Sequence, residues 1–545
     1  MTSRLIRVLV TVVGLVAVLA VTASHADAHA VLIGTSPGND RIVAESPPEI
    51  RLRFDESVEP SLASIVVFDG DARRLPVGNV TSPARGEIVA PIRETLPRGT
   101  FTVVWRSVSV DGHTVSGYFV FHVGAPGPNP TGVIGDVGEG GPPAALQGID
   151  AVSRFLNLAL TLLLIGGVTA LVAVLRGQAP AVESRLWKAT SRVAGAVALI
   201  GAWSVVVQAA KAGEGSITSA LAGDHLRPVL ETNYGTARMI QVAASLLVAG
   251  AAVLAARRPV DPLPGALACA GAAALTVVHG LAGHAGARGA LAVVLDAVHV
   301  GAASVWFGGL ATTALAVLMV RRDRGPVARA TLPRFSGIAL GAVGALVLTG
   351  VVNGLGELDG LGHLVSTTYG RLLVVKVALV GVLVGLAAVS RRRVRRGADP
   401  GHPLGRAVGA ELLLMVVVVG VTTQLIAEPP ARVAARTQET QHTARLDLGG
   451  IAARVVVTPV IAGPNTVEIT LKRDGRSLDV DEVRVAAVNR EAGLGPIRAP
   501  APRTLPGTYV AASMPLLAPG RWTVTVSVRE GEFDQYDDGF TVTLR

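Results

Sequence analysis

Eight long apolar segments constrain the fold of this chain more than any other feature of its sequence. Each has about 20 residues or more, the length that an α-helix needs to cross a bilayer. They lie at 151–175, 189–210, 236–256, 263–283, 289–320, 335–353, 369–390 and 406–427. We interpret the long fifth segment as one tilted helix. Because 50% of the residues are apolar and only 16% are charged, the sequence excludes a soluble enzyme, a disordered protein and a coiled coil.

The basic residues between these segments predict their orientation. The connections after the first, third, fifth and seventh segments carry most of the Lys and Arg residues, including Arg391, Arg392 and Arg393. The other connections carry only Lys211 and two arginines. The positive-inside rule therefore places the basic connections in the cytoplasm and both termini outside the plasma membrane. These loops also account for the net charge of +9, so we expect the lipid bilayer, and no nucleic acid, as a partner.

The N-terminus has the pattern of a secretory signal peptide. Arg4 and Arg7 precede an apolar stretch at 8–21, and residues 26–28 fit a small-x-small cleavage site. Cleavage there would leave His29 as the first residue, although cleavage two residues earlier or later also fits the pattern. An uncleaved membrane anchor is the alternative, but the apolar stretch is short for a span.

Alternating apolar and polar residues predict one β domain before the membrane segment in the sequence and another after it. Short strands separated by Gly and Pro are typical of β-sandwiches. The predicted strands include 50–54, 64–68, 100–104 and 118–123, and later 453–457, 466–471, 482–488 and 522–528. The predicted organisation is mixed: a signal peptide at 1–28, a β-sandwich at 29–124, a Gly/Pro-rich linker at 125–150, an eight-helix membrane domain at 151–428, a linker at 429–444 and an exported immunoglobulin-like β-sandwich at 445–545.

Three residues of the first β domain offer a metal site if cleavage follows residue 28. The α-amine and imidazole of His29 would chelate one metal ion, and Asp111 and His113 would add a carboxylate and a second imidazole. This nitrogen-rich set with one oxygen suits Cu(II). Acid should weaken binding, because the amine and the imidazoles must lose protons to bind metal. The plainer alternative is a frayed terminus and a turn with a solvated histidine.

Several motifs of this segment also occur together in a known family. They are His29-Ala-Val-Leu, Ser36-Pro37, Leu52-Arg-Phe and the stretch 105–117, which contains Asp-Gly-His. Residues 29–124 thereby resemble the CopC copper-binding family. The resemblance implies a Cu(II) site formed by His29, Asp111 and His113. Some members also have a methionine-rich Cu(I) site, which we do not transfer because this domain has no methionine. We assign a structural role to His122.

The membrane segment contains a second set of motifs. They are Gly283-His284-Ala, Asp296 to His299 followed by Trp306-x-Gly-Gly, Arg334-Phe-Ser, Tyr369-Gly-Arg with Lys376, and Glu411. Together they resemble the CopD family, which often follows CopC or is fused to it. The resemblance implies movement of copper across the inner membrane, usually described as uptake.

Ionisable residues within spans are costly and therefore mark candidate ion paths. His279, His284, Asp296 and His299 are the candidates here, and Asp296 and His299 share a helix face because they are three residues apart. Alternatively, these two side chains only form hydrogen bonds with neighbouring spans. Lys376 could pair with Glu411 or with Asp296 in a structural role.

We therefore expect a membrane protein, not an enzyme, that captures Cu(II) outside and passes copper inward for copper uptake and homeostasis. It lacks a Gly-rich ATP-binding loop, which excludes a primary pump. The alternative is a membrane-anchored copper store that delivers to extracytoplasmic copper proteins without transport. Haem ligation by His279 and His299 is a third hypothesis, and an absorption spectrum without a Soret band would exclude it.

Overall fold

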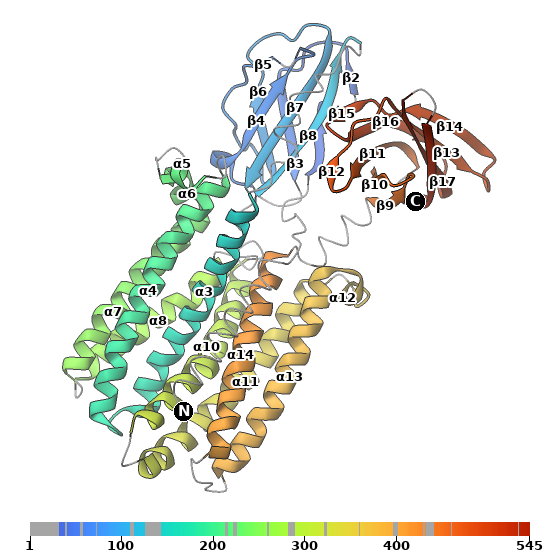
Figure 1. The fold of residues 1–545 in the computed structure, drawn as a ribbon. Coiled ribbons are helices and arrows are strands. Elements are labelled where there is room, and N and C mark those ends of the chain that lie inside the picture. The colour runs from blue at the N-terminus through green and yellow to red at the C-terminus, as the bar shows by residue number, and fades with distance from the viewer. Residues whose placement is uncertain are drawn as a thin grey trace. The chain divides into compact units, whose positions relative to one another are not determined.

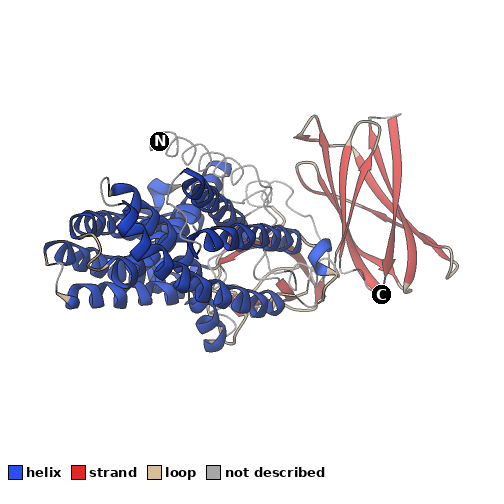
Figure 2. Cartoon of the chain, turned by 90° about the horizontal axis from the view of Figure 1, so that it is seen from below, coloured by secondary structure: helices blue, strands red, loops and turns tan. Residues whose placement is uncertain are grey.

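The protein forms two compact units, one helical and one built of β-strands (Figures 1 and 2). The structure is a computed structural model. It describes residues 32–38, 41–54, 58–71, 73–108, 114–125, 143–212, 216–221, 226–258, 261–281, 289–320, 324–358, 360–395, 402–428, 431, 441–458, 460, 462–531 and 534–544. The helical unit includes residues 142–432, and the β unit contains the strands that precede and follow them in the sequence.

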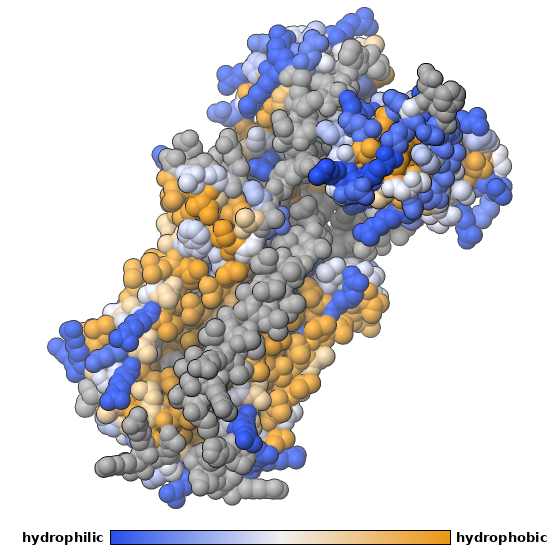
Figure 3. Space-filling model, in the orientation of Figure 1, coloured by the Kyte–Doolittle hydropathy of each residue, from blue (hydrophilic) through white to orange (hydrophobic). Residues whose placement is uncertain are grey.

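Among the described residues, eight helices are long and apolar enough to cross a membrane, which confirms the eight predicted spans. The fifth is one helix, as expected. The eight are α3 (Ala144–Ala170, continued by the π-turn Leu171–Leu175), α4 (Pro180–Ala212), α7 (Asn233–Arg257), α8 (Pro262–Leu281), α10 (Ala290–Met319), α11 (Arg324–Gly356), α13 (Thr368–Arg395) and α14 (His402–Ala427). In Figure 3 the visible face of this unit is largely apolar along its length.

Short helices mark one end of the helical unit. These are α5 (Ile217–Leu221), α6 (Leu226–Glu231) and α12 (His363–Ser366), which connect successive spans at the upper end of the unit in Figure 1. We call this end the α12 end. The arginines in the last turn of α13, Arg392, Arg393 and Arg395, lie at the opposite end, which we call the arginine-rich end. The alternation of basic and non-basic connections along the sequence thus becomes a charge difference between the two ends.

Helix α3 begins seven residues before the predicted span. A carboxylate in its second turn fixes this extension, because Asp150 Oδ2 lies 2.9 Å from Arg154 Nη1 and 3.0 Å from Lys211 Nζ of α4. The sequence patterns placed these turns in the Gly/Pro-rich linker, because Gln147, Gly148 and Asp150 interrupt the apolar run.

Helix α3 is also the most buried of the eight spans, with 67% of its apolar window buried against 6% for α13. Small residues bring it against α10. A Cβ atom added at Gly166 would lie 1.9 Å from the carbonyl oxygen of Ser304, and one added at Gly308 would lie 2.5 Å from the carbonyl oxygen of Leu162. The two backbones are therefore in direct contact, the arrangement that glycine allows between membrane helices.

The N-terminal part of the β unit consists of two sheets. One has the order β1-β3-β6, and the other has the order β2-β8-β7-β4-β5. Alternate residues of the strands, such as Ile50, Leu52, Phe101 and Phe121, fill the core between them. The strands are β1 (Leu32–Ser36), β2 (Arg41–Val43), β3 (Glu49–Phe54), β4 (Ser64–Phe68), β5 (Arg74–Leu75), β6 (Glu87–Pro91), β7 (Gly99–Val108) and β8 (Thr114–Val123). This arrangement confirms the predicted β fold.

The C-terminal part is built of antiparallel sheets. One has the order β15-β16-β11-β10-β9, with β12 paired to β11, and the other has the order β14-β13-β17-β18. Trp522 is fully buried in the core, and its Nε1 donates to the carbonyl oxygen of Ala518 at 2.8 Å. The strands are β9 (His442–Asp447), β10 (Ala452–Thr458), β11 (Gly463–Arg473), β12 (Arg476–Ser477), β13 (Glu482–Asn489), β14 (Leu494–Pro500), β15 (Arg503–Leu505), β16 (Thr508–Leu516), β17 (Gly520–Glu530) and β18 (Asp534–Leu544).

Candidate metal centre and membrane path

The three predicted copper ligands, His29, Asp111 and His113, lie outside the described residues, but the strands on either side of them are described. In sequence, His29 precedes the start of β1 by three residues. Asp111 and His113 fall between β7, which ends at Val108, and β8, which begins at Thr114. One predicted ligand segment contains His29, and the other contains Asp111 and His113. The distance between the strand ends to which they are attached therefore limits the distance between the two segments.

Two aromatic side chains connect these strand ends. Leu32, the first residue of β1, pairs with Phe54 at the end of β3. The ring of Phe54 packs edge to face on Trp105 of β7, with 5.4 Å between centroids and an angle of 72°. The start of β1 and the connection from β7 to β8 therefore lie at the same end of the sandwich. Three residues of extended chain reach about 10 Å, enough to bring His29 toward that connection.

Trp105 also contacts β8 at this end. A Cβ atom added at Gly117 would lie 2.8 Å from Cζ2 of Trp105, so only glycine fits there without a shift. Within the described part of the chain, the buried Nε1 of Trp105 has no hydrogen-bond partner. The sequence patterns assigned Trp105 no role of its own. Its position as the lone tryptophan of this domain, six residues before Asp111, was the available signal.

His122 has the structural role that we assigned to it. It lies on β8 with 8% of its surface exposed, and its Nδ1 is 3.0 Å from Oγ1 of Thr100 on β7. This hydrogen bond joins two neighbouring strands of one sheet.

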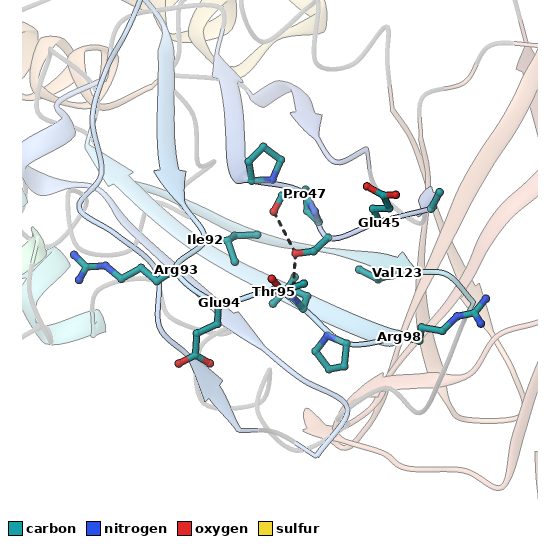
Figure 4. A pocket seen from close by; sticks show the side chains of 13 residues that line it. Glu45, Pro47, Ile92, Arg93, Glu94, Thr95, Arg98 and Val123 are labelled. Carbon is teal, nitrogen blue, oxygen red and sulfur yellow. Dashed lines mark hydrogen bonds between the residues drawn. The ribbon is translucent and has the colours of Figure 1, made fainter.

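A groove of about 570 Å³ lies at the other end of this sandwich (Figure 4). It is lined by the turns around Ser46 and Leu96 and by Val123, the last residue of β8. The Ser46 hydroxyl accepts a hydrogen bond from the backbone N–H of Leu96 at 2.9 Å. The ten residues of β8 separate Val123 from Thr114 by about 30 Å. The groove is therefore remote from the predicted copper ligands.

In the helical unit, polar side chains from several spans meet near the α12 end. On α10, His299 Nδ1 lies 2.9 Å from Oγ1 of Thr349 on α11. A Cβ atom added at Gly280 of α8 would lie 3.3 Å from Oδ2 of Asp296, so this glycine leaves room for the carboxylate. Lys376 of α13 interacts electrostatically with Asp296 and with His299. We call Asp296, His299, Thr349 and Lys376 the polar cluster.

The structure thereby distinguishes the two partners that the sequence offered for Lys376. Its ammonium group interacts with Asp296, whereas Glu411 of α14 accepts a hydrogen bond from the hydroxyl of Ser390. The polar cluster thus combines one carboxylate, one ammonium group and one imidazole, with a single formal negative charge balanced by a single positive charge when His299 is neutral.

The other two predicted path residues are not part of this cluster. His279 interacts electrostatically with Arg238 of α7, and His284 lies outside the described residues. Among the side chains that the structure describes, no three of His, Cys, Asp or Glu are close enough together to hold a metal ion.

A second polar network connects the first spans. Gln241 Nε2 of α7 donates to Oδ1 of Asn157 on α3 at 2.6 Å, and Arg238 Nη1 donates to Oε1 of Gln241 at 2.6 Å. With Arg154 and Lys211 on Asp150, these helices carry more cationic than anionic groups.

The fold and these polar groups define a multi-pass membrane protein with a β domain before its first span. Known families match all of these parts. A CopC domain model matches residues 32–124, a model of the N-terminal domain of copper resistance protein D-like proteins matches residues 146–293, and a copper resistance protein D model matches residues 329–425.

Three curated relatives agree with these matches. The chain is 25% identical to copper transport protein CutJ of Bacillus subtilis (strain 168), over 95% of this chain and 96% of that protein. It is 33% identical to copper resistance protein D of Pseudomonas syringae pv. tomato, over 36% of this chain and 69% of that protein. It is 32% identical to copper resistance protein C of Escherichia coli, over 18% of this chain and 86% of that protein. The chain belongs to the CopC–CopD family of copper resistance and copper transport proteins.

Proposed function

We propose that this protein captures Cu(II) outside the membrane and passes copper inward through its helical unit. His29, Asp111 and His113 capture the ion, and the polar cluster lies on the path across the membrane. The observation that carries the proposal is the Phe54–Trp105 contact, which supports a single site made from both ligand segments.

The membrane step is supported by the charge and position of the polar cluster. Asp296 and His299 lie six and nine residues from the start of α10, which is about 9 and 13 Å along the helix. A carboxylate and an imidazole at this depth offer ligands to a cation that has left water. Lys376 already neutralises Asp296 when no metal is present, which reduces the cost of keeping a carboxylate in a span. An arriving copper ion has to displace this ammonium group.

The capture site can be tested by electron paramagnetic resonance of the full chain titrated with Cu(II). One extra residue before His29 removes the amine–imidazole chelate, so affinity should fall about tenfold or more, which corresponds to at least about 1.4 kcal/mol. His122→Gln is the control and should leave the signal unchanged, because His122 is bonded within the sandwich. Equal binding by both variants would reject His29 as a ligand.

Transport can be tested by copper accumulation in cells with and without the protein. Cells that produce it should accumulate copper faster, and Asp296→Asn should abolish the difference while the Cu(II) resonance signal of the purified chain persists. Equal accumulation with and without the protein would reject transport and favour a copper store that delivers to extracytoplasmic proteins.

A further inference from the structure

The imidazole of His299 packs against one face of α11. Its Nδ1 lies 2.9 Å from Oγ1 of Thr349, and the ring is also within hydrogen-bonding distance of the backbone carbonyl of Leu346. A Cβ atom added at Gly350 would lie 3.3 Å from Cε1 and 3.8 Å from Nδ1 of the ring. Thr349 and Gly350 follow Leu346 by three and four residues, so all three lie on one face of the helix. We call these three residues the imidazole seat.

The imidazole seat is a buried part of a helix that is otherwise little covered by protein. Only 17% of the apolar window of α11 is buried, whereas Thr349 has 4% of its surface exposed. Gly350 leaves the space that the ring occupies, because non-bonded carbon atoms approach to about 3.5 Å and an added Cβ atom would be nearer to Cε1 than that. Helix α11 therefore fits the ring closely on this side.

The hydrogen bonds of Thr349 indicate which ring nitrogen of His299 carries a hydrogen. The hydroxyl group has one hydrogen, and its Oγ1 lies 2.7 Å from the carbonyl oxygen of Ala345, which can only accept. The hydroxyl therefore donates to Ala345 and accepts from Nδ1 of His299. The carbonyl oxygen of Leu346 also requires a donor on this side of the ring. The imidazole seat thus favours the form of His299 that has its hydrogen on Nδ1.

The other ring nitrogen, Nε2, is then the one that can bind a metal ion. A neutral imidazole with its hydrogen on Nδ1 has its free lone pair on Nε2. The Nε2 atom lies more than 4 Å from the Cβ position at Gly350, farther than Cε1 and Nδ1, so it is on the side of the ring away from the seat. In metal sites, the hydrogen bond made by one ring nitrogen fixes the other nitrogen as the ligand.

We propose that Thr349 is a positioning residue, which holds His299 in the form with its hydrogen on Nδ1 so that Nε2 binds the copper ion on the membrane path. This proposal rests on the proposed transport function, which makes His299 part of that path. Thr349 itself does not touch the ion. It acts by orienting the ring and by fixing the position of its hydrogen, as partners of metal-binding histidines do in other proteins.

Nuclear magnetic resonance of the full chain in copper-free liposomes tests the position of the hydrogen directly. Histidine is labelled with carbon-13 and nitrogen-15, and the signals that are missing from His299→Gln identify His299. In the wild type, the protonated ring nitrogen should correlate with Cγ, the carbon bonded to Nδ1. In Thr349→Val, a protonated nitrogen that correlates with Cδ2 should appear, because Cδ2 is bonded to Nε2. A hydrogen on Nε2 in the wild type, or identical spectra for the wild type and Thr349→Val, would overturn the proposal.

Copper accumulation in cells tests the effect of Thr349 on transport. Thr349→Val keeps the shape of the side chain but removes the hydroxyl group, so the initial rate should fall about tenfold or more. Thr349→Ser restores the hydroxyl group and should recover most of the wild-type rate. Thr423→Val in α14 is the matched control and should keep the wild-type rate, because Thr423 is also buried and its hydroxyl donates to its own helix, at the carbonyl oxygen of Val419.

A second pair of variants tests the fit of the ring on α11. Gly350→Ala should displace the ring and slow accumulation, whereas Gly344→Ala, where an added Cβ atom meets nothing within 4 Å, should not. Equal rates for Thr349→Val and Thr423→Val would overturn this proposal alone. If wild-type cells accumulate copper no faster than cells lacking the protein, the proposed function fails, and the resonance spectra still decide the role of Thr349. Should Thr349→Val not fold, the wild-type spectrum and Gly350→Ala decide.

Discussion

Replacing Gly166 by alanine should separate α3 from α10. The added Cβ atom would lie 1.9 Å from the carbonyl oxygen of Ser304 and 2.6 Å from the backbone nitrogen of Gly309. Both are backbone atoms, so no side-chain rotation can relieve the contact. Non-bonded heavy atoms of this kind approach to about 3.5 Å. The two helices must therefore move apart by more than 1 Å.

The expected cost follows from the loss of this packing. Forcing one extra carbon into a packed interior costs about 1–3 kcal/mol, and a clash with backbone belongs at the upper end of that range. Alanine recovers about 0.5–1 kcal/mol of helix propensity, so the net destabilisation should be about 2 kcal/mol. The shift also moves Asp296, His299 and Trp306, which lie on α10. Copper accumulation should therefore fall along with stability.

Thermal unfolding of the purified chain in detergent measures the first effect, and copper accumulation in cells measures the second. Gly341→Ala in α11 is the matched control, because an added Cβ atom there meets nothing within 4 Å. This variant should be as stable as wild type or slightly more stable. If Gly166→Ala unfolds at the same temperature as Gly341→Ala, the close contact between α3 and α10 is wrong.

Three further variants test other parts of the structure by thermal unfolding. Burial raises the pKa of Glu428. The contribution of this carboxyl group to stability is therefore complete below the usual carboxyl pKa and is lost as the pH rises through the raised pKa. Glu428→Gln should thus raise the unfolding temperature more at pH 8 than at pH 5. Trp522→Ala should destabilise the C-terminal sandwich by about 3–5 kcal/mol, and an unchanged transition there would contradict its central place in the core. Asp150→Asn leaves Lys211 and Arg154 without their shared carboxylate and should cost about 3 kcal/mol, part of which Lys211→Met should restore.

The sequence predicted the spans well because crossing a bilayer imposes a length and a hydropathy that short-range patterns reveal. The β fold on either side was predictable for a similar reason, since alternation of apolar and polar residues reports a half-buried strand. The π-turn that ends α3 and the first two turns of that helix were not predictable from the same patterns. They depend on contacts with other helices, such as the ion pair between Asp150 and Lys211.

The candidate site was predictable only in part. Sequence spacing placed Asp296 and His299 on one face of α10 but could not show that Thr349 and Lys376 come from two other helices to meet them. It offered two partners for Lys376 and could not choose between them. The partner of Lys376 depends on which helices are neighbours. Close backbone contacts at glycines that are far apart in the sequence determine which helices pack together.

The central position of α3 sets an order on the assembly of this protein in the membrane. Helices α4, α7 and α8 follow α3 in synthesis and can pack around it early. The glycine face of α3 that receives α10 must wait until more than 130 further residues have been made, because Ser304 lies that far beyond Gly166. A chain that stops after α8 exposes this face to lipid. Completion of α10 is therefore the step that covers this glycine face, and a nascent chain should become more resistant to membrane proteases and quality control only after that point.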